Sequence, residues 1–343
     1  MHVRHRRAVS WRLPAEWEEQ EAVWLVWPRD PDTWPGRVDK VRKVFVQAMR
    51  AIAPQTVHLV VHPDLLADAR AALVAMPHVN IYSCIHQDSW IRDYGPLTLV
   101  DDRGGRKALK FHFDAWGGKY ESLMADDAVV PRLVAAGAMP AVEAVPFVLE
   151  GGAVETDGQG TFLATESVAA GRGQSVAEHE NTLRTHLGAR NVVWLGEGIT
   201  GDDTDGHIDT ITRFVAPGKV VTAVVPAGHR DHAALADNRR RLAAATDAAG
   251  RRLDILDLPV PRTVTTDDGK VLPAGYANFL ITNHAVLVPQ YGDAAAGRAA
   301  DAQALATVGA CLPGRRAVGL PHEDLIWGFG GIHCLSMQVP AVG

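Results

Sequence analysis

The chain has 343 residues, of which 47% are hydrophobic and 22% are charged, and its formal net charge is -6 at pH 7. A chain of this length and composition can bury a large apolar core. The acidic balance argues against a general nucleic-acid-binding protein, because sequence-independent affinity for DNA comes from Lys and Arg contacts to phosphate. It favours cationic ligands instead.

Short apolar runs alternate with longer helical patterns along the whole chain, and this alternation predicts an α/β fold. In chain order, strands are expected at residues 22–27, 57–62, 80–85, 107–113, 161–164, 192–195, 220–225 and 285–289. Helices are expected at residues 37–53, 63–75, 126–136, 175–187, 231–249 and 293–308. The segment 263–275, which contains Asp267-Asp268-Gly269, is expected to form an exposed turn or loop.

The sequence gives no sign of a domain boundary. No Pro/Ser-rich linker divides it, so we expect residues 1–343 to form a single domain. The basic residues 1–7 precede no apolar run, and no stretch approaches about 20 apolar residues, so neither a signal peptide nor a transmembrane helix is expected. Three cysteines without Cys-x-x-Cys spacing suit a reducing compartment. We therefore expect a cytoplasmic protein without nucleic-acid or membrane partners.

A glycine-rich turn, Gly330-Gly331-Ile332-His333-Cys334, carries one of the three cysteines. Such a turn can present a nucleophile, and a cysteine attacks as the thiolate when a histidine or a positive environment activates it. The alternative for Cys334 is a buried small hydrophobe, since free cysteines are among the most buried residues. Cys84, in an apolar run, and Cys311, at a predicted helix end, lack acid/base neighbours, so we expect both to be structural.

Two further clusters carry paired carboxylates: Arg92-Asp93 within residues 87–96, and Asp205-Gly206-His207-Ile208-Asp209. Acidic side chains can hold a planar guanidinium through paired, charge-assisted hydrogen bonds. Together with the thiol, they indicate chemistry on a guanidine carbon. Arg92-Asp93 could instead be a local ion pair, which at an exposed site contributes less than about 1 kcal/mol.

His207 lies among four aspartates, at positions 202, 203, 205 and 209, and this acidic setting predicts a raised pKa. A raised pKa would suit a general acid that protonates a leaving amine. Two other interpretations remain open, a satisfied core histidine and a metal site. The run lacks the spacing of an EF-hand loop, and no His-Glu-x-x-His motif accompanies it, so no metal is expected.

The motifs together resemble the agmatine deiminases, which are grouped with bacterial-type peptidylarginine deiminases in the guanidino-group-modifying superfamily. The resemblance rests on five sequence blocks, in family order: Asp88-Ser89-Trp90-Ile91-Arg92-Asp93-Tyr94-Gly95-Pro96, Phe113-Asp114-Ala115-Trp116-Gly117-Gly118-Lys119-Tyr120, Glu150-Gly151-Gly152, Asp205-Gly206-His207-Ile208-Asp209 and Gly330-Gly331-Ile332-His333-Cys334. With Trp27-Pro28 it covers nearly the whole chain, which makes it far more specific than one short motif. Ala153 is a departure, because the family often has a polar residue after Glu-Gly-Gly.

The resemblance implies a fold. It is a five-bladed, pseudo-symmetric α/β propeller of ββαβ modules, with the active site in the central channel and side chains contributed by several modules. From pattern alone, a doubly wound sheet is the alternative. The family also suggests a homo-oligomer, although no heptad repeat or interface stripe is visible in the sequence.

The resemblance also implies roles for individual residues. Cys334 would be the nucleophile and His207 the acid and base, Asp93 and Asp209 would bind the guanidinium nitrogens, and Glu150 would support His207. The substrate-binding set expected from the same motifs is Asp88, Trp90, Arg92, Trp116 and Gly331. Neither a metal nor an organic cofactor is required.

The implied activity is hydrolysis of agmatine to N-carbamoylputrescine and ammonia through an S-alkylthiouronium intermediate on Cys334, a step toward polyamines. The reaction-centre motifs leave open peptidyl-arginine or another guanidino compound as substrate. Amidinotransfer would follow if an amine rather than water intercepted the intermediate. From other classes, a metal-dependent hydrolase using the 202–209 cluster and a non-catalytic guanidinium-binding protein also remain open.

Overall fold

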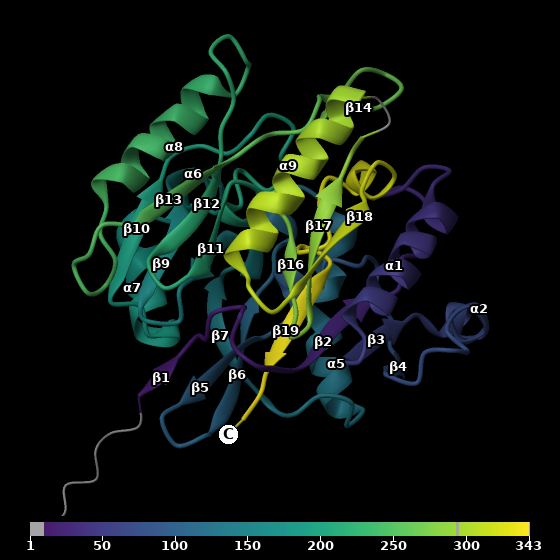
Figure 1. The fold of residues 1–343 in the computed structure, drawn as a ribbon. Helices are drawn as coiled ribbons and strands as arrows, with labels where there is room; N and C mark the ends of the chain where they lie inside the picture. Colours follow the sequence, from purple (N-terminus) through teal and green to yellow (C-terminus); the bar gives the residue numbers. More distant parts are fainter. Residues whose placement is uncertain (1–9, 293–294, 343) are drawn as a thin grey trace, which may run out of the picture.

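The computed structural model describes residues 10–292 and 295–342 as a mixed α/β protein, which confirms the predicted fold class (Figure 1). The basic residues 1–7 and the expected helix start at position 293 lie outside the described residues. Within the described part, no helix is both long enough and apolar enough to cross a membrane.

Five sheets of three or four strands repeat one pairing pattern in the described chain. In each sheet an antiparallel pair is followed by a parallel strand. The first two sheets contain β19 (Ser336–Pro340), β2 (Gln20–Val26), β3 (Thr56–Val61) and β4 (Val79–Ser83), then β1 (Trp11–Arg12), β5 (Leu97–Asp101), β6 (Arg106–His112) and β7 (Val142–Val148). The other three contain β8 (Glu155–Thr156), β9 (Thr161–Thr165) and β10 (Asn191–Leu195); β11 (Thr212–Ala216), β12 (Lys219–Ala223) and β13 (Asp254–Leu258); and β16 (Leu280–Ile281), β17 (Ala285–Gln290) and β18 (Arg316–Pro321).

Helices provide the crossovers between the parallel strands, as parallel pairing requires. The helices are α1 (Val38–Ile52), α2 (Leu66–Ala72), α3 (Ile91–Tyr94), α4 (Ala115–Gly118), α5 (Val129–Ala135), α6 (Glu166–Gly171), α7 (Val176–Leu187), α8 (His232–Ala244) and α9 (Ala295–Cys311). Five short 3₁₀ segments are η1 (Pro63–Leu65), η2 (Glu121–Ala128), η3 (Gly151–Ala153), η4 (Ile208–Thr210) and η5 (Leu325–Gly328). Helices α1, α5, α7 and α8 lie toward the outside of the molecule, and the strands lie further in (Figure 1).

The interior strands are apolar on both faces, because helices cover one side and the molecular centre covers the other. In β2, every residue except Glu21 is buried, and β17 is buried from Ala285 to Pro289. Helix α1 packs one apolar stripe inward, in which Val41, Phe45 and Met49 recur at helical spacing. This packing makes each sheet a rigid platform for the loops at its strand ends.

All eight predicted strands are present, with ends shifted by one or two residues. The strands that were not predicted are short or partly polar, such as β7 and β13. The helix expected at 126–136 begins as the 3₁₀ segment η2, and the one expected at 231–249 ends at Ala244, because Thr246 pairs with Arg252 in a bridge. The loop expected at 263–275 contains a hairpin, β14 (Val264–Thr265) and β15 (Val271–Leu272), which turns at Gly269 with φ 88°.

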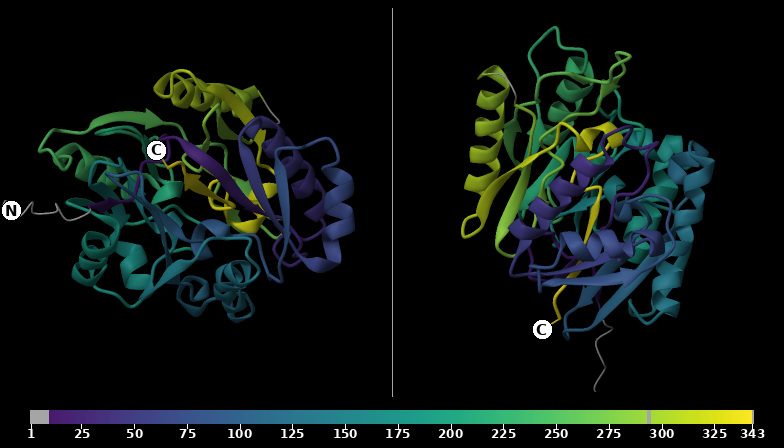
Figure 2. Two further views of the ribbon diagram at one scale, coloured as in Figure 1. Left: turned by 90° about the horizontal axis from the view of Figure 1, so that it is seen from below. Right: turned by 90° about the vertical axis from the view of Figure 1, so that its right-hand side faces the viewer.

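The C-terminal strand β19 shares a sheet with β2, the second strand of the chain. β19 pairs antiparallel with β2, with Ser336 opposite Leu25 and Met337 opposite Trp24. In both views of Figure 2 the yellow C-terminal strand runs beside the purple N-terminal segment. Cys334, two residues before β19, is therefore fixed against a buried sheet rather than held on a free end.

Replacing Ser175 with alanine should lower the free energy of unfolding by about 1 kcal/mol. Ser175 begins α7 with a capping box, in which its Oγ accepts a hydrogen bond from the Glu178 backbone N–H (3.2 Å) and the Glu178 carboxylate accepts one from the Ser175 N–H (2.9 Å). Alanine leaves the Glu178 N–H without its side-chain acceptor. Urea unfolding measures the difference, and an unchanged midpoint would contradict it.

Candidate active site

The turn that carries Cys334 is held tightly in place. The side-chain oxygen of Asn278 accepts hydrogen bonds from the backbone N–H groups of His333 (3.0 Å) and Cys334 (3.3 Å). A Cβ at Gly331 would lie 2.4 Å from that oxygen, and a Cβ at Gly330 would lie 2.5 Å from the Trp90 ring. The two glycines are thus required by close packing, and the cysteine that they position is 4% exposed.

The environment of Cys334 favours the neutral thiol in the unliganded protein. Burial raises the pKa of Cys334 well above its usual range, and the nearby carboxylates of Asp209 and Asp93 raise it further. The Sγ atom lies 3.5 Å from Oδ2 of Asp209. The side-chain N–H of Asn278 donates to Sγ at 3.0 Å and acts in the opposite direction. A cation placed between the carboxylates would offset their effect and favour the thiolate.

Asp93 and Asp209 form a carboxylate pair next to the thiol. Asp93, on α3, accepts hydrogen bonds from the indole N–H of Trp116 (3.0 Å) and the backbone N–H of Gly152 (3.2 Å). Burial, Asp209 and Glu150 raise the pKa of Asp93 well above its usual range. Asp209 behaves differently: burial opposes ionisation, but the hydrogen bond and charge of His333, together with His207 and Arg213, lower the pKa of Asp209.

His207 is buried between two carboxylates but makes no side-chain hydrogen bond among the described residues. Its Nδ1 lies 3.7 Å from Oδ1 of Asp93, and its Nε2 lies 3.9 Å from Oε2 of Glu150. Burial lowers the pKa of His207 to about 3, although Asp209 acts to raise it. The expectation of a raised pKa was wrong, because desolvation outweighs the neighbouring charges.

The aspartates adjacent to His207 in sequence are turned toward other partners. Asp205 forms ion pairs with Lys119 (2.6 Å) and Arg172 (2.7 Å). Asp202 accepts hydrogen bonds from the backbone N–H and hydroxyl of Thr204. Within residues 10–292 and 295–342, no group of three or more His, Cys, Asp or Glu side chains has an arrangement that could hold a metal ion.

Glu150, which immediately precedes η3, lies beside Nε2 of His207, whereas Asp93 lies beside Nδ1. Its Oε1 accepts from Nε of Arg172 at 2.6 Å, while its Oε2 is buried without a hydrogen bond. Burial raises the pKa of Glu150, against the effect of Arg172. Arg172 therefore fixes the carboxylate and leaves one oxygen facing the imidazole.

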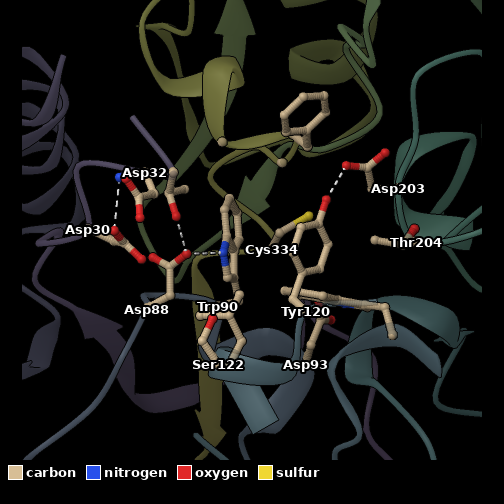
Figure 3. Close-up of a pocket in the computed structure, with 16 residues that line it drawn as sticks. Asp30, Asp32, Asp88, Trp90, Asp93, Tyr120, Ser122, Asp203, Thr204 and Cys334 are labelled. Carbon is tan, nitrogen blue, oxygen red and sulfur yellow. Dashed lines mark hydrogen bonds between the residues drawn. The ribbon is translucent and has the colours of Figure 1, made fainter. Parts of the chain in front are cut away.

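A cavity of about 190 Å³ reaches Cys334 (Figure 3). Its described lining includes five carboxylates and no Lys, Arg or His: Asp30, Asp32, Asp88, Asp93 and Asp203. Aromatic side chains form much of the remaining wall: Trp90, Trp116, Tyr120 and Phe329. Figure 3 shows Asp30, Asp32 and Asp88 on one side of Trp90, with Tyr120 and Asp203 on the other. This cavity suits a slender cation with an apolar middle.

The predicted substrate-binding residues are only partly in this lining. Asp88, Trp90 and Trp116 are there. Arg92 is not: its Nε donates to the carbonyl of His333 (3.2 Å) and its Nη1 to Oε1 of Gln338 (2.7 Å), so it supports the cysteine turn from behind. Gly331 packs against Asn278 and also lies outside the lining. Arg92 and Gly331 thus support the cysteine turn and do not line the cavity.

Several residues around the site were not predicted from the sequence. They are Glu16, Arg172, Arg213, Asn278 and His333's ring as a hydrogen-bonding group. Arg213 gave a usable signal, since a lone arginine in the apolar strand β11 must find buried acidic partners. Glu16 gave none, because it is one of several acidic residues in its segment.

Changing Asp88 to asparagine should flatten the pH dependence of stability. Burial raises the pKa of Asp88 from 3.8 to about 7, against hydrogen bonds from Thr33, Ser89 and Trp90. Between those values the folded protein holds a proton that the unfolded chain releases, so stability falls as pH rises through this window. The variant lacks this loss, so its free energy of unfolding relative to that of wild type should rise by about 2.5 kcal/mol between pH 5 and pH 8. Urea unfolding at pH 5 and 8 tests this, and parallel changes in both proteins would refute it.

The fold and the cluster of thiol, histidine and carboxylates define a protein of the guanidino-group-modifying class. Residues 12–340 match the family described as Porphyromonas-type peptidyl-arginine deiminase, and the chain belongs to this family, with the agmatine deiminases. It is a hydrolase of the agmatine deiminase family.

Individual relatives match along almost their full length. A putative agmatine deiminase of Lactococcus lactis is 35% identical over 96% of both chains, and an agmatine deiminase of Stutzerimonas stutzeri is 31% identical over 98% of this chain and 97% of its own. The solved structure of the agmatine deiminase of Enterococcus faecalis superposes with a TM-score of 0.86 at 32% identity, covering 97% of this chain and 96% of that one. The family resemblance seen in the motifs is thereby confirmed.

Proposed function

We propose that this protein hydrolyses the guanidino group of agmatine to N-carbamoylputrescine and ammonia, with Cys334 as the nucleophile. The observation that carries the proposal is the cavity, in which a thiol lies beside Asp93 at the end of an acidic, aromatic-walled pocket. A guanidinium next to the carboxylates of Asp93 and Asp209 would present its central carbon to Sγ.

The charge of the lining favours agmatine over arginine and peptidyl-arginine. Agmatine carries a second cation, its primary ammonium, four methylenes from the guanidinium. Asp30 and Asp32 offer negative charge away from the thiol, Asp88 adds to it when it ionises with a pKa of about 7, and no described cation in the lining could bind a carboxylate. Free arginine would place its carboxylate among these aspartates, and like charges repel. A peptide chain would have to pass the same residues.

The first half of the reaction forms a C–S bond and breaks a C–N bond. When the cationic substrate offsets the charges of Asp93 and Asp209, the thiol proton passes to the neutral imidazole of His207 and Sγ attacks the guanidine carbon. The imidazolium of His207 then protonates the departing nitrogen, and ammonia leaves. The product of this half is an S-alkylthiouronium on Cys334. Glu150 orients the imidazole and stabilises its transient charge.

The second half of the reaction hydrolyses the intermediate and regenerates the free enzyme. His207 takes a proton from a water molecule as its oxygen adds to the thiouronium carbon, and collapse of the adduct breaks the C–S bond. The carbon leaves as the ureido group of N-carbamoylputrescine, its hydroxyl proton is released to solvent, and the imidazolium of His207 returns the proton taken from water to the sulfur. Within this scheme the residues of the chain supply the nucleophile, acid, base and charge stabilisation, and no cofactor enters a step.

The proposal includes the finer architecture. We infer that the five repeated sheets are blades of one α/β propeller, that residues 1–343 form one catalytic domain, and that the central ends of the blades contribute the site. This inference is supported by the positions of Asp93, Asp209 and Cys334, which lie in the segments after β4, before β11 and before β19. We also propose a homo-oligomer in the cytoplasm. Light scattering of the purified protein tests the assembly, and a mass of 36.9 kDa would contradict it.

Release of ammonia and ureido product should be measured with agmatine, arginine and a blocked arginyl peptide. Turnover of agmatine, with kcat/KM at least about 100-fold above that of the other two, is the expected result. Preferred turnover of the peptide would move the assignment to protein deimination. Inactivation by iodoacetamide but not by a chelator is expected for thiol chemistry, and the reverse would favour a metal-dependent hydrolase.

A further inference from the structure

A buried network of charged side chains lies behind Cys334, outside the cavity. The ring of His333, 1% exposed, joins two carboxylates: its Nδ1 lies 2.6 Å from Oδ2 of Asp209, and its Nε2 lies 2.6 Å from Oε2 of Glu16. Each contact needs one hydrogen, since a carboxylate oxygen only accepts, so a ring that satisfies both donates from both nitrogens. His333 thus links Asp209 to a residue 193 positions away in sequence from it.

The two oxygens of Asp209 have different surroundings as a result. Oδ2 is engaged by His333 and lies 3.5 Å from Sγ of Cys334. Oδ1 is buried and has no hydrogen-bond partner among the described residues. An unpartnered buried carboxylate oxygen is costly unless a ligand satisfies it. One oxygen is therefore committed to the protein and the other is available to a cation.

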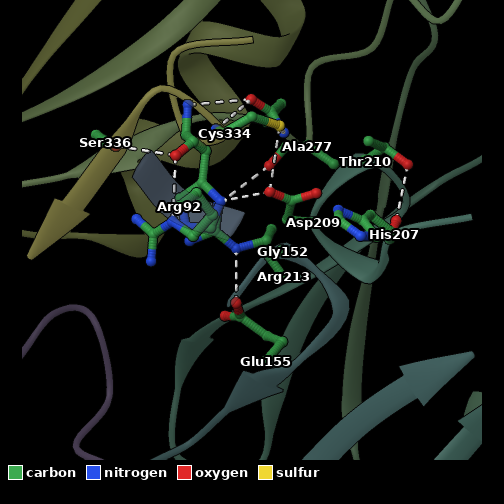
Figure 4. Close-up of polar contacts among 12 residues, drawn as sticks. Arg92, Gly152, Glu155, His207, Asp209, Thr210, Arg213, Ala277, Cys334 and Ser336 are labelled. Carbon is green, nitrogen blue, oxygen red and sulfur yellow. Dashed lines mark hydrogen bonds and ion pairs between the residues drawn. The ribbon is translucent and has the colours of Figure 1, made fainter. Parts of the chain in front are cut away.

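Glu16, at the end of this network opposite Asp209, is held in place by further contacts. Glu16 accepts from Nη2 of Arg213 (2.8 Å) and from the backbone N–H of Ile281 (2.6 Å), and Nη2 of Arg92 lies 3.7 Å away. Although burial opposes ionisation, these cations and His333 hold the pKa of Glu16 well below its usual range. Arg213 is itself bound at Nε by Glu155 (2.9 Å), and Figure 4 shows this pair on the side of the cluster away from Cys334. The brace keeps the His333 ring in one orientation.

We propose that His333, braced by Glu16, is a positioning residue that fixes the carboxylate of Asp209 and leaves its Oδ1 as the single oxygen directed to the substrate guanidinium. The inference rests on the proposed function, because it assigns a role at the same site. His333 does not touch the cavity, and it acts through Asp209.

The need for such a residue follows from the charges around Asp209. The titratable and charged groups facing it are Asp93, Arg92, Asp202, His207, Arg213, His333 and Cys334. Asp93, which has no Lys or Arg partner among the described residues, shows what burial beside a second carboxylate does: its pKa rises well above the usual range. Without the hydrogen bond from His333, Asp209 would be equally buried and would face the same repulsion. Asp209 would then be protonated and would bind a cation less tightly.

The test compares His333→Gln with His179→Gln. A glutamine amide can donate to only one of the two carboxylates and carries no charge. His179, on α7, is equally buried, at 1% exposed, and its ring contacts Gln174 rather than the site, so it controls for the loss of a buried imidazole. We expect His333→Gln to raise KM for agmatine by about tenfold or more and to shift the acid limb of kcat/KM to higher pH. His179→Gln should change neither.

A second readout needs no substrate. In protein labelled with [γ-¹³C]aspartate, the signal that disappears in Asp209→Asn reports the titration of Asp209. The midpoint of this titration should rise by about one pH unit or more in His333→Gln. It should rise less in Glu16→Gln, which keeps the His333 ring but removes the carboxylate that holds it. Glu16→Gln also serves as the test if His333→Gln does not fold. An unchanged midpoint would overturn the inference. Wild-type protein inactive on agmatine, with the midpoint shifted as expected, would instead contradict the proposed function alone.

Discussion

Replacement of Cys334 by alanine should lower kcat for agmatine by about 10⁵-fold, since loss of a nucleophile that acts together with its base removes nearly all of the chemical acceleration. Binding should survive, because Asp93, Asp209 and the acidic lining are unchanged. Isothermal titration should therefore give a Kd for agmatine within about tenfold of the wild-type KM. Removing the thiol also removes the hydrogen bond that it donates to Oδ2 of Asp209, 3.5 Å away.

Cys311→Ala is the matched control for this experiment. Cys311 ends α9, is partly exposed, and is a free thiol like Cys334. Its substitution should leave kcat and KM unchanged, and iodoacetamide should still inactivate that variant. Wild-type turnover by Cys334→Ala would refute covalent catalysis at this position. Equal losses in both variants would point to a general effect on folding.

The sequence was sufficient to predict the fold class and to select residues that the structure places close together near Cys334. The period of apolar residues located the interior strands, because β2, β3, β9 and β17 are buried runs of β-branched and apolar side chains. Glycine-flanked motifs located Cys334, Glu150 and the residues around His207. Glycine is required at Gly331 and Gly152 because close packing at both positions leaves no room for a Cβ.

The sequence was insufficient where the chemistry depends on long-range contacts. Glu16 and His333 are 317 positions apart, and no local pattern links them. The pKa of His207 was predicted in the wrong direction, because burial outweighs the charges of Asp209 and Asp205, which act to raise it. Asp205, which has a left-handed backbone with φ 70°, also forms ion pairs with Lys119 and Arg172. Burial, which decides the pKa, is a property of the assembled sheets.

His207→Asn should lower kcat for agmatine by about 10³-fold to 10⁴-fold, because the same imidazole is proposed to protonate the leaving nitrogen and to activate water. Its low pKa, about 3, makes it neutral before substrate binds and so able to accept the thiol proton. His179→Asn is the control, since burial also lowers the pKa of His179, to about 4, on a helix remote from the thiol. That variant should retain wild-type kcat and KM.

An analogue whose leaving group needs no proton separates the two roles of His207. The S-methylisothiourea of 1,4-diaminobutane would expel methanethiolate, which takes up the proton of the Cys334 thiol, and so form the same thiouronium on Cys334 without His207 as acid or base. His207→Asn should then accumulate the adduct, because water activation is still missing, and intact-protein mass spectrometry should detect it; Cys334→Ala should show none. Hydrolysis of the adduct at the wild-type rate would mean that another group activates water. Glu150 would then be the residue to change next. Its Oε2 lies 3.9 Å from Nε2 of His207 and has no hydrogen bond among the described residues.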